Sequence, residues 1–281
     1  MIEWKSDLHI HTTHSDGSMC PKEVLDLAKH KGLDVIAITD HDIVSGVEEA
    51  ITYGKSIGMK VLSGIELSSF STTSVHILGY NIDYKNKDLV QELDNLLEKR
   101  RERAKKIIDK LANYKVIVDI NNLPSINVGR SHIAKEIRNN GYVTTIQEAF
   151  DRYLAEGRLA YVPSSRLVPI KAVELVKKAG GKAVIAHPMQ LLNSGKLELL
   201  IEGLLPYGLD GLEVYYPTHT EKDIEKLKSI AKKYNLFETG GSDFHGIYKN
   251  ASLNMIGNIK CPLAKELNIF EKTFNKKHYK K

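Results

Sequence analysis

Histidine and carboxylate side chains follow two apolar runs in the first 42 residues. His9 and His11 are two residues apart in DLHIH, so an extended backbone directs both imidazoles to one face, and Asp16 follows after a short polar turn. Asp40, His41 and Asp42 follow the run DVIAIT at residues 34–39. Imidazole and carboxylate groups without thiolate suit zinc, manganese or iron. The spacing therefore predicts metal ligands at the ends of two successive strands.

The stretch SDLHIHTTHSDGSMCPKEVLDLAKHKGLDVIAITDHD closely resembles the amino-terminal signature of the PHP (polymerase and histidinol phosphatase) family of metal-dependent phosphoesterases. That family takes further ligands from later strand ends, and the matching motifs here are SGIELSS, SVHILGY, AVIAHPM and GGSDFHG. The resemblance implies nine metal ligands: His9, His11, Asp16, His41, Glu66, His76, His187, Asp243 and His245. It also implies three ions, with Glu66 bridging two of them, whereas the number of ligands alone permits two or three. Asp40 and Asp42 flank His41, where each could orient an imidazole or cap a turn.

Clustered divalent ions can activate a water near neutral pH, polarise a phosphoryl oxygen and neutralise charge on the leaving oxygen. Phosphoryl transfer mainly requires positioning and electrostatic stabilisation, so no serine or cysteine nucleophile is needed. We therefore expect hydrolysis of a phosphate ester by a metal-activated hydroxide, with manganese, iron or zinc as the ion. The predicted catalytic residues are Asp16, His41, Glu66, His187 and His245.

Short apolar runs that are rich in β-branched residues predict seven strands, at about 2–10, 34–39, 60–67, 75–80, 182–187, 210–216 and 236–242. Helical patterns separate most of them. One begins at Pro21, another begins with the capping pair Ser45 and Glu48, and two more cover about 169–179 and 219–234. This alternation predicts a parallel sheet, and seven strands favour a closed or nearly closed barrel.

The resemblance implies a distorted (βα)7 barrel of the α/β class. Catalytic groups in such barrels come from the carboxyl ends of the strands. His76 does not fit this rule, because it lies at the start of its predicted strand. Either the strand boundary is misplaced or the strand runs differently.

About 100 residues separate the fourth and fifth predicted strands, which is far more than a barrel needs. Within this gap, residues 98–166 contain 14 Lys and Arg against 8 Asp and Glu, a net charge of +6, whereas the whole chain carries +5. We predict a small helical insertion at 98–166 that caps the substrate site, with the barrel formed by 1–97 and 167–281. A basic cap over a carboxylate-rich centre suits an anionic substrate.

Three residues are predicted to bind substrate: Arg130, His132 and His219. Arg130 and His132 lie in GRSHIA, and similar members of the family use a matching Arg and His to bind substrate phosphate. Arg130 offers a planar fork, and a helix starting near Ser131 would add backbone donors. The alternatives are an ordinary surface arginine beside a helix cap and, for His219 in YYPTHT, a loop or capping histidine.

Within the family, the sequence is most similar to stand-alone members that act on nucleoside 3',5'-bisphosphates and on the 5' ends of small RNAs. We expect a small phosphorylated substrate, hydrolysed to a nucleoside monophosphate, with 5'-3' degradation of short RNA as a related activity. One alternative is a histidinol-phosphate phosphatase. Others are a non-catalytic metal-binding module and a nucleic-acid-binding module, although the helical insertion offers few aromatic residues for base stacking.

No run of about 18 apolar residues is present, and the start of the sequence lacks the apolar stretch of a secretory signal. The two cysteines, Cys20 and Cys261, are too few for a disulfide framework. The sequence therefore favours a cytoplasmic protein that neither spans a membrane nor shows an obligate protein partner.

Overall fold

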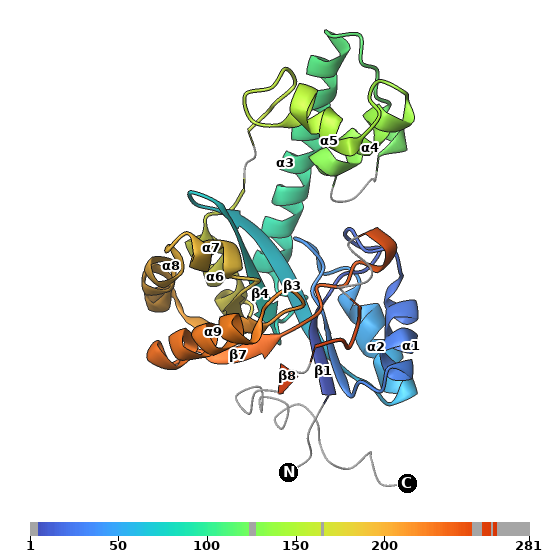
Figure 1. Cartoon of the computed structure of the whole chain (residues 1–281). Helices are drawn as coiled ribbons and strands as arrows, with labels where there is room; N and C mark the ends of the chain where they lie inside the picture. Colours follow the sequence, from blue (N-terminus) through green and yellow to red (C-terminus); the bar gives the residue numbers. More distant parts are fainter. Residues whose placement is uncertain (1–4, 124–127, 164–165, 249–254, 260, 263–281) are drawn as a thin grey trace. The chain divides into compact units, whose positions relative to one another are not determined.

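The structure is a computed structural model that describes residues 5–123, 128–163, 166–248, 255–259 and 261–262. Its internal contacts divide the chain into two compact units (Figure 1). The first unit combines Met1–Tyr84 with Val168–Lys281, and the second comprises Lys85–Leu167. The first unit contains the sheet, and the second is helical.

The sheet of the first unit has eight strands in the order β7-β6-β5-β4-β3-β2-β1-β8. Their bounds are β1 (Lys5–Ile10), β2 (Val35–Ile38), β3 (Lys60–Phe70), β4 (Ser74–Tyr80), β5 (Lys182–Ile185), β6 (Leu209–Tyr215), β7 (Phe237–Gly240) and β8 (Cys261–Pro262). Each of the seven predicted runs overlaps one strand, and β3 extends three residues beyond its run. The two-residue β8, which is antiparallel to β1, was not predicted. The seven predicted strands therefore lie side by side in chain order along one sheet.

The sheet is curled, so that the segment after β7 lies beside β1. The His11 amide donates to the Phe244 carbonyl over 2.9 Å, and the Phe244 amide donates to the His9 carbonyl over 3.3 Å. The approach is close, because a Cβ atom at Gly241 would lie 2.3 Å from the Cβ of His9. Glycine is therefore required at this position. The buried apolar cluster between the strands comprises Leu8, Val35, Ala37, Leu62, Leu78, Tyr80, Val184 and Ala186.

The prediction of a fully parallel sheet was wrong at β4, which is antiparallel to both β3 and β5. Only three residues, at 71–73, connect β3 to β4, and a parallel connection needs a crossover of a dozen or more residues. Because β4 runs in the opposite direction, its first residues lie at the edge where β1, β2 and β3 end. His76, opposite Ser68 of β3, therefore lies at the expected edge although it begins its strand.

Helices flank the sheet on both sides (Figure 1). They are α1 (Pro21–His30), α2 (Val47–Ile57), α6 (Pro169–Lys178), α7 (Met189–Asn193), α8 (Leu197–Leu204) and α9 (Glu221–Lys233), with short 3-10 turns η3 (Leu205–Tyr207) and η4 (Gly246–Tyr248). The capping pair predicted at Ser45 was wrong. Gly46 is the N-cap of α2 and makes no side-chain cap, whereas the Ser45 hydroxyl lies 2.6 Å from Nδ1 of His14. The hydroxyl thus makes a hydrogen bond to the loop after β1 instead of capping the helix.

The second unit consists of α3 (Lys87–Ala112), η1 (Ile120–Asn122), α4 (Arg130–Asn139), α5 (Ile146–Ala149) and the π-helical turn η2 (Phe150–Leu154). The Asn86 side chain caps α3 by accepting from the Leu89 amide. One apolar face of α3 packs onto the other elements, with Ala104, Ile107 and Leu111 buried. No helix in the described ranges is long and apolar enough to cross a membrane.

Candidate metal centre

The structure brings together all nine side chains that were predicted to bind metal. They lie at one edge of the curled sheet in the first unit: His9 and His11 at the end of β1, Asp16 in the loop that follows, His41 after β2, Glu66 on β3, His76 on β4, His187 after β5, and Asp243 and His245 after β7. Seven strands and connections contribute. The site therefore forms only when the whole sheet has curled.

Glu66 is the centre of this arrangement, and its carboxylate is buried. Its Oε2 lies 3.1 to 3.2 Å from one nitrogen of each of three imidazoles, those of His9, His11 and His41. Its Oε1 lies 2.8 Å from Nδ1 of His76 and 3.0 Å from Nε2 of His187. A single carboxylate is thus shared by five imidazoles from five positions in the sheet.

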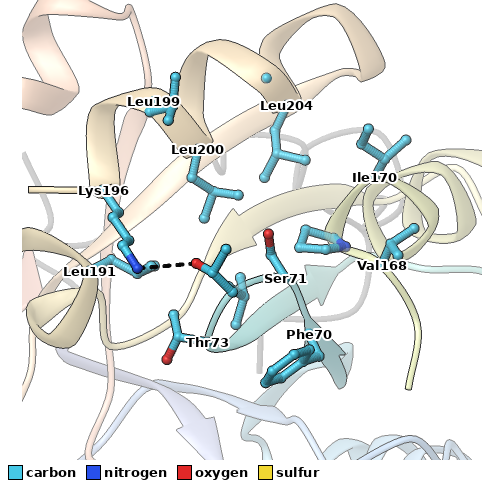
Figure 2. Close-up of a pocket in the computed structure, with 14 residues that line it drawn as sticks. Phe70, Ser71, Thr73, Val168, Ile170, Leu191, Lys196, Leu199, Leu200 and Leu204 are labelled. Atoms are coloured by element: carbon cyan, nitrogen blue, oxygen red, sulfur yellow. Dashed lines mark hydrogen bonds between the residues drawn. The ribbon is translucent and has the colours of Figure 1, made fainter. Parts of the chain in front are cut away.

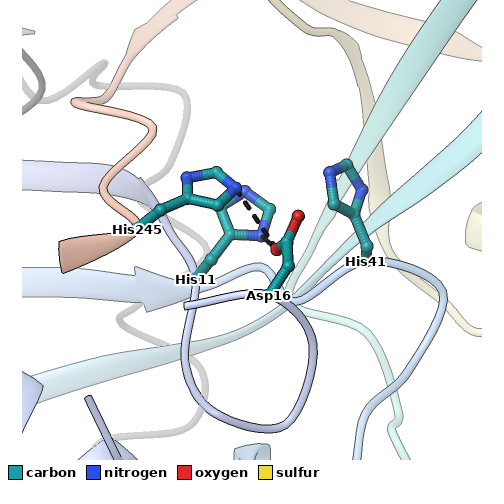
Figure 3. A group of neighbouring side chains, drawn as sticks. All are labelled: His11, Asp16, His41 and His245. Carbon is teal, nitrogen blue, oxygen red and sulfur yellow. Dashed lines mark ion pairs between the residues drawn. The ribbon is translucent and has the colours of Figure 1, made fainter. Parts of the chain in front are cut away.

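A second carboxylate, Asp16, faces the other side of His11 (Figure 3). Its Oδ1 lies 3.5 Å from Nδ1 of His11 and 3.2 Å from Nε2 of His245. Three groups of donor atoms, each within 4.8 Å of one another, can be distinguished: His11, Asp16, His41 and His245; His9, His11, Glu66 and Asp243; and His41, Glu66 and His76. Each shares a residue with another, which is the arrangement that adjacent ions with bridging ligands require.

The donor atoms fit a divalent ion. His9 Nε2, both ring nitrogens of His11 and Glu66 Oε2 are buried and make no hydrogen bond to any residue in the described ranges. A buried polar atom without a hydrogen bond is costly, and a cation bound by His9 Nε2, Glu66 Oε2 and one ring nitrogen of His11 would satisfy these atoms. Nitrogen and carboxylate oxygen without thiolate are the donors that zinc, manganese and iron take. The assignment of individual ligands nevertheless remains a prediction.

The charges of the centre also favour a cation. Burial raises the pKa of Glu66, but the neighbouring imidazoles of His41, His9 and His76 outweigh it and hold that pKa well below its usual range. Burial lowers the pKa of His41 to about 3. Burial likewise lowers the pKa of His11, but the carboxylates of Asp243 and Glu66 raise it to about 9. An ionised Glu66 carboxylate therefore faces the imidazoles, and the proton on His11 carries positive charge where a cation would bind.

Three non-glycine residues at this edge have left-handed backbones: Asp42 at φ 53°, His187 at φ 27° and Asp243 at φ 51°. Such conformations cost about 1–3 kcal/mol each and persist where the surroundings fix them. The His187 amide donates to Oε2 of Glu213 over 2.6 Å, and the Tyr216 hydroxyl donates to Oδ2 of Asp243 over 2.7 Å. These two contacts hold strained residues in place at the ends of their strands.

Glu213 was not predicted from the sequence, yet it is fully buried beside the centre. Its Oε1 lies 2.9 Å from Nδ1 of His9, and its Oε2 accepts the His187 amide. A carboxylate on Nδ1 fixes the proton there and leaves Nε2 of His9 facing Glu66. The available signal was a lone carboxylate in the apolar run GLEVYY of the sixth predicted strand.

Asp40, whose role the sequence left open, holds the loop that carries Asp16. It accepts the Thr12 amide and the Thr12 hydroxyl, each over 2.7 Å, and the Ser15 hydroxyl over 2.5 Å. Asp42 accepts the Ser68 amide over 2.8 Å. Both aspartates thus brace backbone segments that carry candidate ligands.

Of the three predicted substrate residues, one lies in the first unit and two lie in the second. His219 belongs to the first unit, where Nδ1 donates to the Val214 carbonyl over 2.7 Å and the ring lies 5.3 Å from that of Tyr216. Arg130 and His132 lie in the second unit at the start of α4, and Nδ1 of His132 accepts the Gly129 amide over 3.1 Å. Their contact with substrate stays a prediction.

A cavity of about 150 Å³ opens onto the centre and is lined by His41, Glu66, His76, His187, Tyr216 and Asp243. A larger cavity of about 390 Å³ lies between the turn after β3 and helices α6, α7 and α8 (Figure 2). Its walls are mostly apolar, as with Phe70 and Leu200, and Lys196 donates to the Thr72 hydroxyl across one side. Only the smaller cavity offers donors for a metal.

We expect Glu213→Gln to lower metal affinity by about 10- to 100-fold, which is typical when a partner of a metal-binding histidine is lost. Glutamine has one acceptor oxygen, whereas Glu213 accepts from both His9 and the His187 amide. If the NH2 group of the new side-chain amide faces the His187 amide, two donors oppose one another. If it faces Nδ1 of His9 instead, that nitrogen must accept, and the ring proton moves to Nε2. Metal content after dialysis against a graded chelator measures the effect.

Glu238→Gln is the matched control. Glu238 lies on the neighbouring β7, is half-buried, and accepts the Tyr215 hydroxyl over 2.9 Å. We expect this variant to keep wild-type metal affinity. Equal affinities for the Glu213 and Glu238 variants would contradict the role given to Glu213.

Comparison with known proteins places these observations in a family. The PHP domain matches residues 7–156. A 5'-3' exoribonuclease of Haemophilus influenzae is 33% identical over 86% of this chain and 90% of its own length. A 3',5'-nucleoside bisphosphate phosphatase of Chromobacterium violaceum is 32% identical over 85% and 86%. A phosphoribosyl 1,2-cyclic phosphate 1,2-diphosphodiesterase of Eggerthella lenta is 32% identical over 88% and 95%.

Among solved structures, a candidate metal-dependent phosphoesterase of Bifidobacterium adolescentis superposes with a TM-score of 0.78 at 29% identity, over 89% of this chain and 91% of that one. The relatives and this likeness define the class of protein: a metal-dependent phosphoesterase. Within that class the chain belongs to the PHP family, because the domain match covers more than half of it.

Proposed function

We propose that the protein hydrolyses a nucleoside 3',5'-bisphosphate to a nucleoside monophosphate, with stepwise removal of nucleotides from RNA 5' ends as a related reaction. The observation that carries the proposal is the convergence of nine imidazole and carboxylate groups at one edge of the sheet, where five of them line one small cavity. Two relatives support this choice of substrate, one named for each activity. Each is about a third identical to this chain over most of its length.

Two or three divalent ions, when bound, would supply an activated water and neutralise charge on the transferred phosphoryl group. The chain's own residues position them and the substrate. Glu66 and Asp16 provide shared carboxylates, and His76 and His187 line the cavity. Glu213 orients His9, and Tyr216 holds Asp243 through its hydroxyl. The proposal assigns catalysis to Asp16, His41, Glu66, His187 and His245.

The second phosphate of a bisphosphate needs a site of its own, because the metal centre holds only the phosphate that is cleaved. We assign it to the helical segment 98–166, which carries a net charge of +6 and contains Arg130 and His132. The third proposed substrate residue is His219, whose ring lies 5.3 Å from that of Tyr216. We also propose that the first unit is a distorted (βα)7 barrel and that the protein is cytoplasmic.

A second candidate function is hydrolysis of a phosphoribosyl cyclic phosphate. The Eggerthella lenta relative has that activity in its name and is as similar to this chain as the bisphosphate phosphatase is. Both substrates carry two phosphate groups on one ribose, so the number of phosphates does not distinguish them. The phosphate that is cleaved does: it is a monoester in the bisphosphate and a cyclic diester in the phosphoribosyl cyclic phosphate.

The test compares kcat/KM for four substrates: adenosine 3',5'-bisphosphate, a 5'-phosphorylated oligoribonucleotide, phosphoribosyl 1,2-cyclic phosphate and histidinol phosphate. We expect the bisphosphate to be best and histidinol phosphate to be poorest. The oligoribonucleotide should lose affinity steeply with added salt, because several phosphate contacts contribute. A best result with the cyclic phosphate or with histidinol phosphate overturns the proposal in favour of that function.

A further inference from the structure

The cavity of about 390 Å³ beside helices α6, α7 and α8 lies on the other face of the sheet from the metal centre. Successive side chains of a strand point to opposite faces, and on β4 His76 lines the small cavity at the metal centre whereas Val75 lines the larger one. Gly79 points to the same face as Val75, and a Cβ atom there would lie 2.8 Å from the Val176 side chain on α6. The larger cavity therefore lies between the sheet and the helices that cover it, and among the described residues the two cavities share no lining side chain.

The walls of the larger cavity are predominantly apolar (Figure 2). Leu200 and Leu204 extend from α8 toward the turn that joins β3 to β4, and Phe70 lies on the opposite side. Phe70, Val168 and Leu199 line the cavity although they are 48%, 53% and 73% exposed. Large apolar side chains gathered around one hollow mark a binding site, whereas single scattered ones do not. The walls therefore suit the apolar body of a ligand.

The polar groups of the cavity come from the β3–β4 turn and from one lysine. Ser71, Thr72 and Thr73 contribute hydroxyls, and Lys196 donates to the Thr72 hydroxyl over 3.2 Å. Of the described residues that line the cavity, Lys196 alone carries a charge, and no carboxylate of the described chain pairs with it. An ammonium group has three donors, so two remain for a ligand. A positive charge beside an apolar hollow favours an anion with an apolar body.

We propose that this cavity binds a small molecule with an aliphatic body and one carboxylate, at a site separate from the metal centre. Ligand cavities span about 300–1,000 Å³ and combine mostly apolar walls with a few polar groups that fix orientation, which is the composition found here. The leucines of α8 contact the aliphatic body, and Lys196 with the turn hydroxyls contacts the carboxylate. Because Lys196 is exposed, its ion pair contributes little, and most of the affinity comes from apolar burial. The inference does not depend on which phosphate ester the metal centre cleaves.

The test is calorimetric titration of the metal-loaded full chain with butanoate, hexanoate, octanoate and decanoate. We expect affinity to rise about fourfold for each added CH2 group that is buried, which corresponds to about 0.8 kcal/mol. Octan-1-ol should bind more weakly than octanoate, and octylammonium more weakly still, because Lys196 repels it. A carboxylate can also bind a metal ion, so octanoate is tested as an inhibitor of 4-nitrophenyl phosphate hydrolysis. It should not raise KM, since the two cavities are separate.

Two kinds of variant separate the apolar body from the charge. Leu200→Trp fills the cavity and should lower octanoate affinity by about tenfold or more, since excluding two CH2 groups already has that effect. Gly203→Leu serves the same purpose if circular dichroism shows that Leu200→Trp does not fold. Gly203 also lines the cavity, and a Cβ atom there meets no other atom within 4 Å. Lys196→Gln should remove the difference between octanoate and octan-1-ol while keeping the effect of chain length.

Lys228→Gln is the matched control for the lysine variant, because Lys228 is an exposed lysine on α9 that does not line the cavity. It should keep both the affinity for octanoate and the preference over octan-1-ol. Equal losses in the Lys196 and Lys228 variants would remove the carboxylate from the proposal and so overturn it.

Three further outcomes overturn the proposal. They are the absence of saturable decanoate binding with a Kd below about 1 mM, an affinity that does not change with chain length, and competitive inhibition by octanoate, which places it at the metal centre. A dimer in light scattering that Leu199→Asp converts to a monomer would instead assign this face to a second copy of the chain. None of these results bears on the proposed bisphosphate hydrolysis, which the substrate comparison tests by itself.

Discussion

Replacing Glu66 with glutamine is expected to lower kcat by about a thousandfold or more, a loss of about 4 kcal/mol of transition-state stabilisation. The variant should also lose most of its bound metal. The Glu66 carboxylate lies within 3.2 Å of five imidazoles. In the glutamine variant an NH2 group would replace one of the two carboxylate oxygens that face these imidazoles. Single-turnover kinetics and metal analysis of the purified variant measure both effects.

Glu225→Gln is the matched control for this experiment, because Glu225 is exposed on α9 and the change removes the same charge from the surface. It should leave turnover and metal content unchanged. A Glu66 variant with wild-type turnover and metal content would rule out the central role of this carboxylate.

Removing the metal with a chelator is expected to abolish activity and to lower Tm by about 10 °C or more. A ligand at a thousand times its Kd stabilises a protein by about 4 kcal/mol, and 1 kcal/mol shifts Tm by about 2–4 °C at this size. The metal-free centre retains crowded carboxylates and imidazoles, which only protons can then compensate. Scanning calorimetry of loaded and chelated protein measures the difference.

The difference in Tm should widen as the pH rises from 6.5 to 9. Without a cation the pKa of His11 is raised to about 9 from an ordinary value of 6.5. The protonated imidazole therefore stabilises the metal-free fold fully below pH 6.5, and this contribution is lost as the pH rises through 9. Metal binds neutral imidazole, so the loaded protein does not suffer the same loss. A gap that stays constant or narrows over this range would contradict the argument.

Local sequence patterns could predict most of the strands and the positions of some candidate ligands, whereas the later ones came from the family resemblance. His9 and His11 alternate with apolar residues in one run, and His41 follows another with only Asp40 between them, so a strand and its polar end can be recognised within a few residues. The start of helix α9 is also determined locally, because Thr220 and Asp223 form a capping box within four residues. Such features depend on spacing along one segment, which the sequence displays.

The features that the sequence could not show depend on direction and on distant partners. His76 violates the rule for parallel barrels until β4 is known to run antiparallel to β3, a pairing that depends on the turn between them. Glu213 resembles an interruption of an apolar strand until His9, 204 positions away, lies beside it. Ser45 matches a helix cap locally, but His14 in another loop lies beside its hydroxyl.

The spread of the donor residues along the chain also has a consequence for biosynthesis. His9 and His11 leave the ribosome early, whereas Asp243 and His245, which face them across the curled sheet, are made more than 230 residues later. At about 5–20 residues per second, some 12–50 seconds separate the two ends of the site. A nascent chain thus presents loose histidine pairs to the cell's metal pool long before the shared carboxylates enclose an ion. The complete set of candidate ligands therefore exists only at the last stage of folding, when the segment after β7 docks against β1.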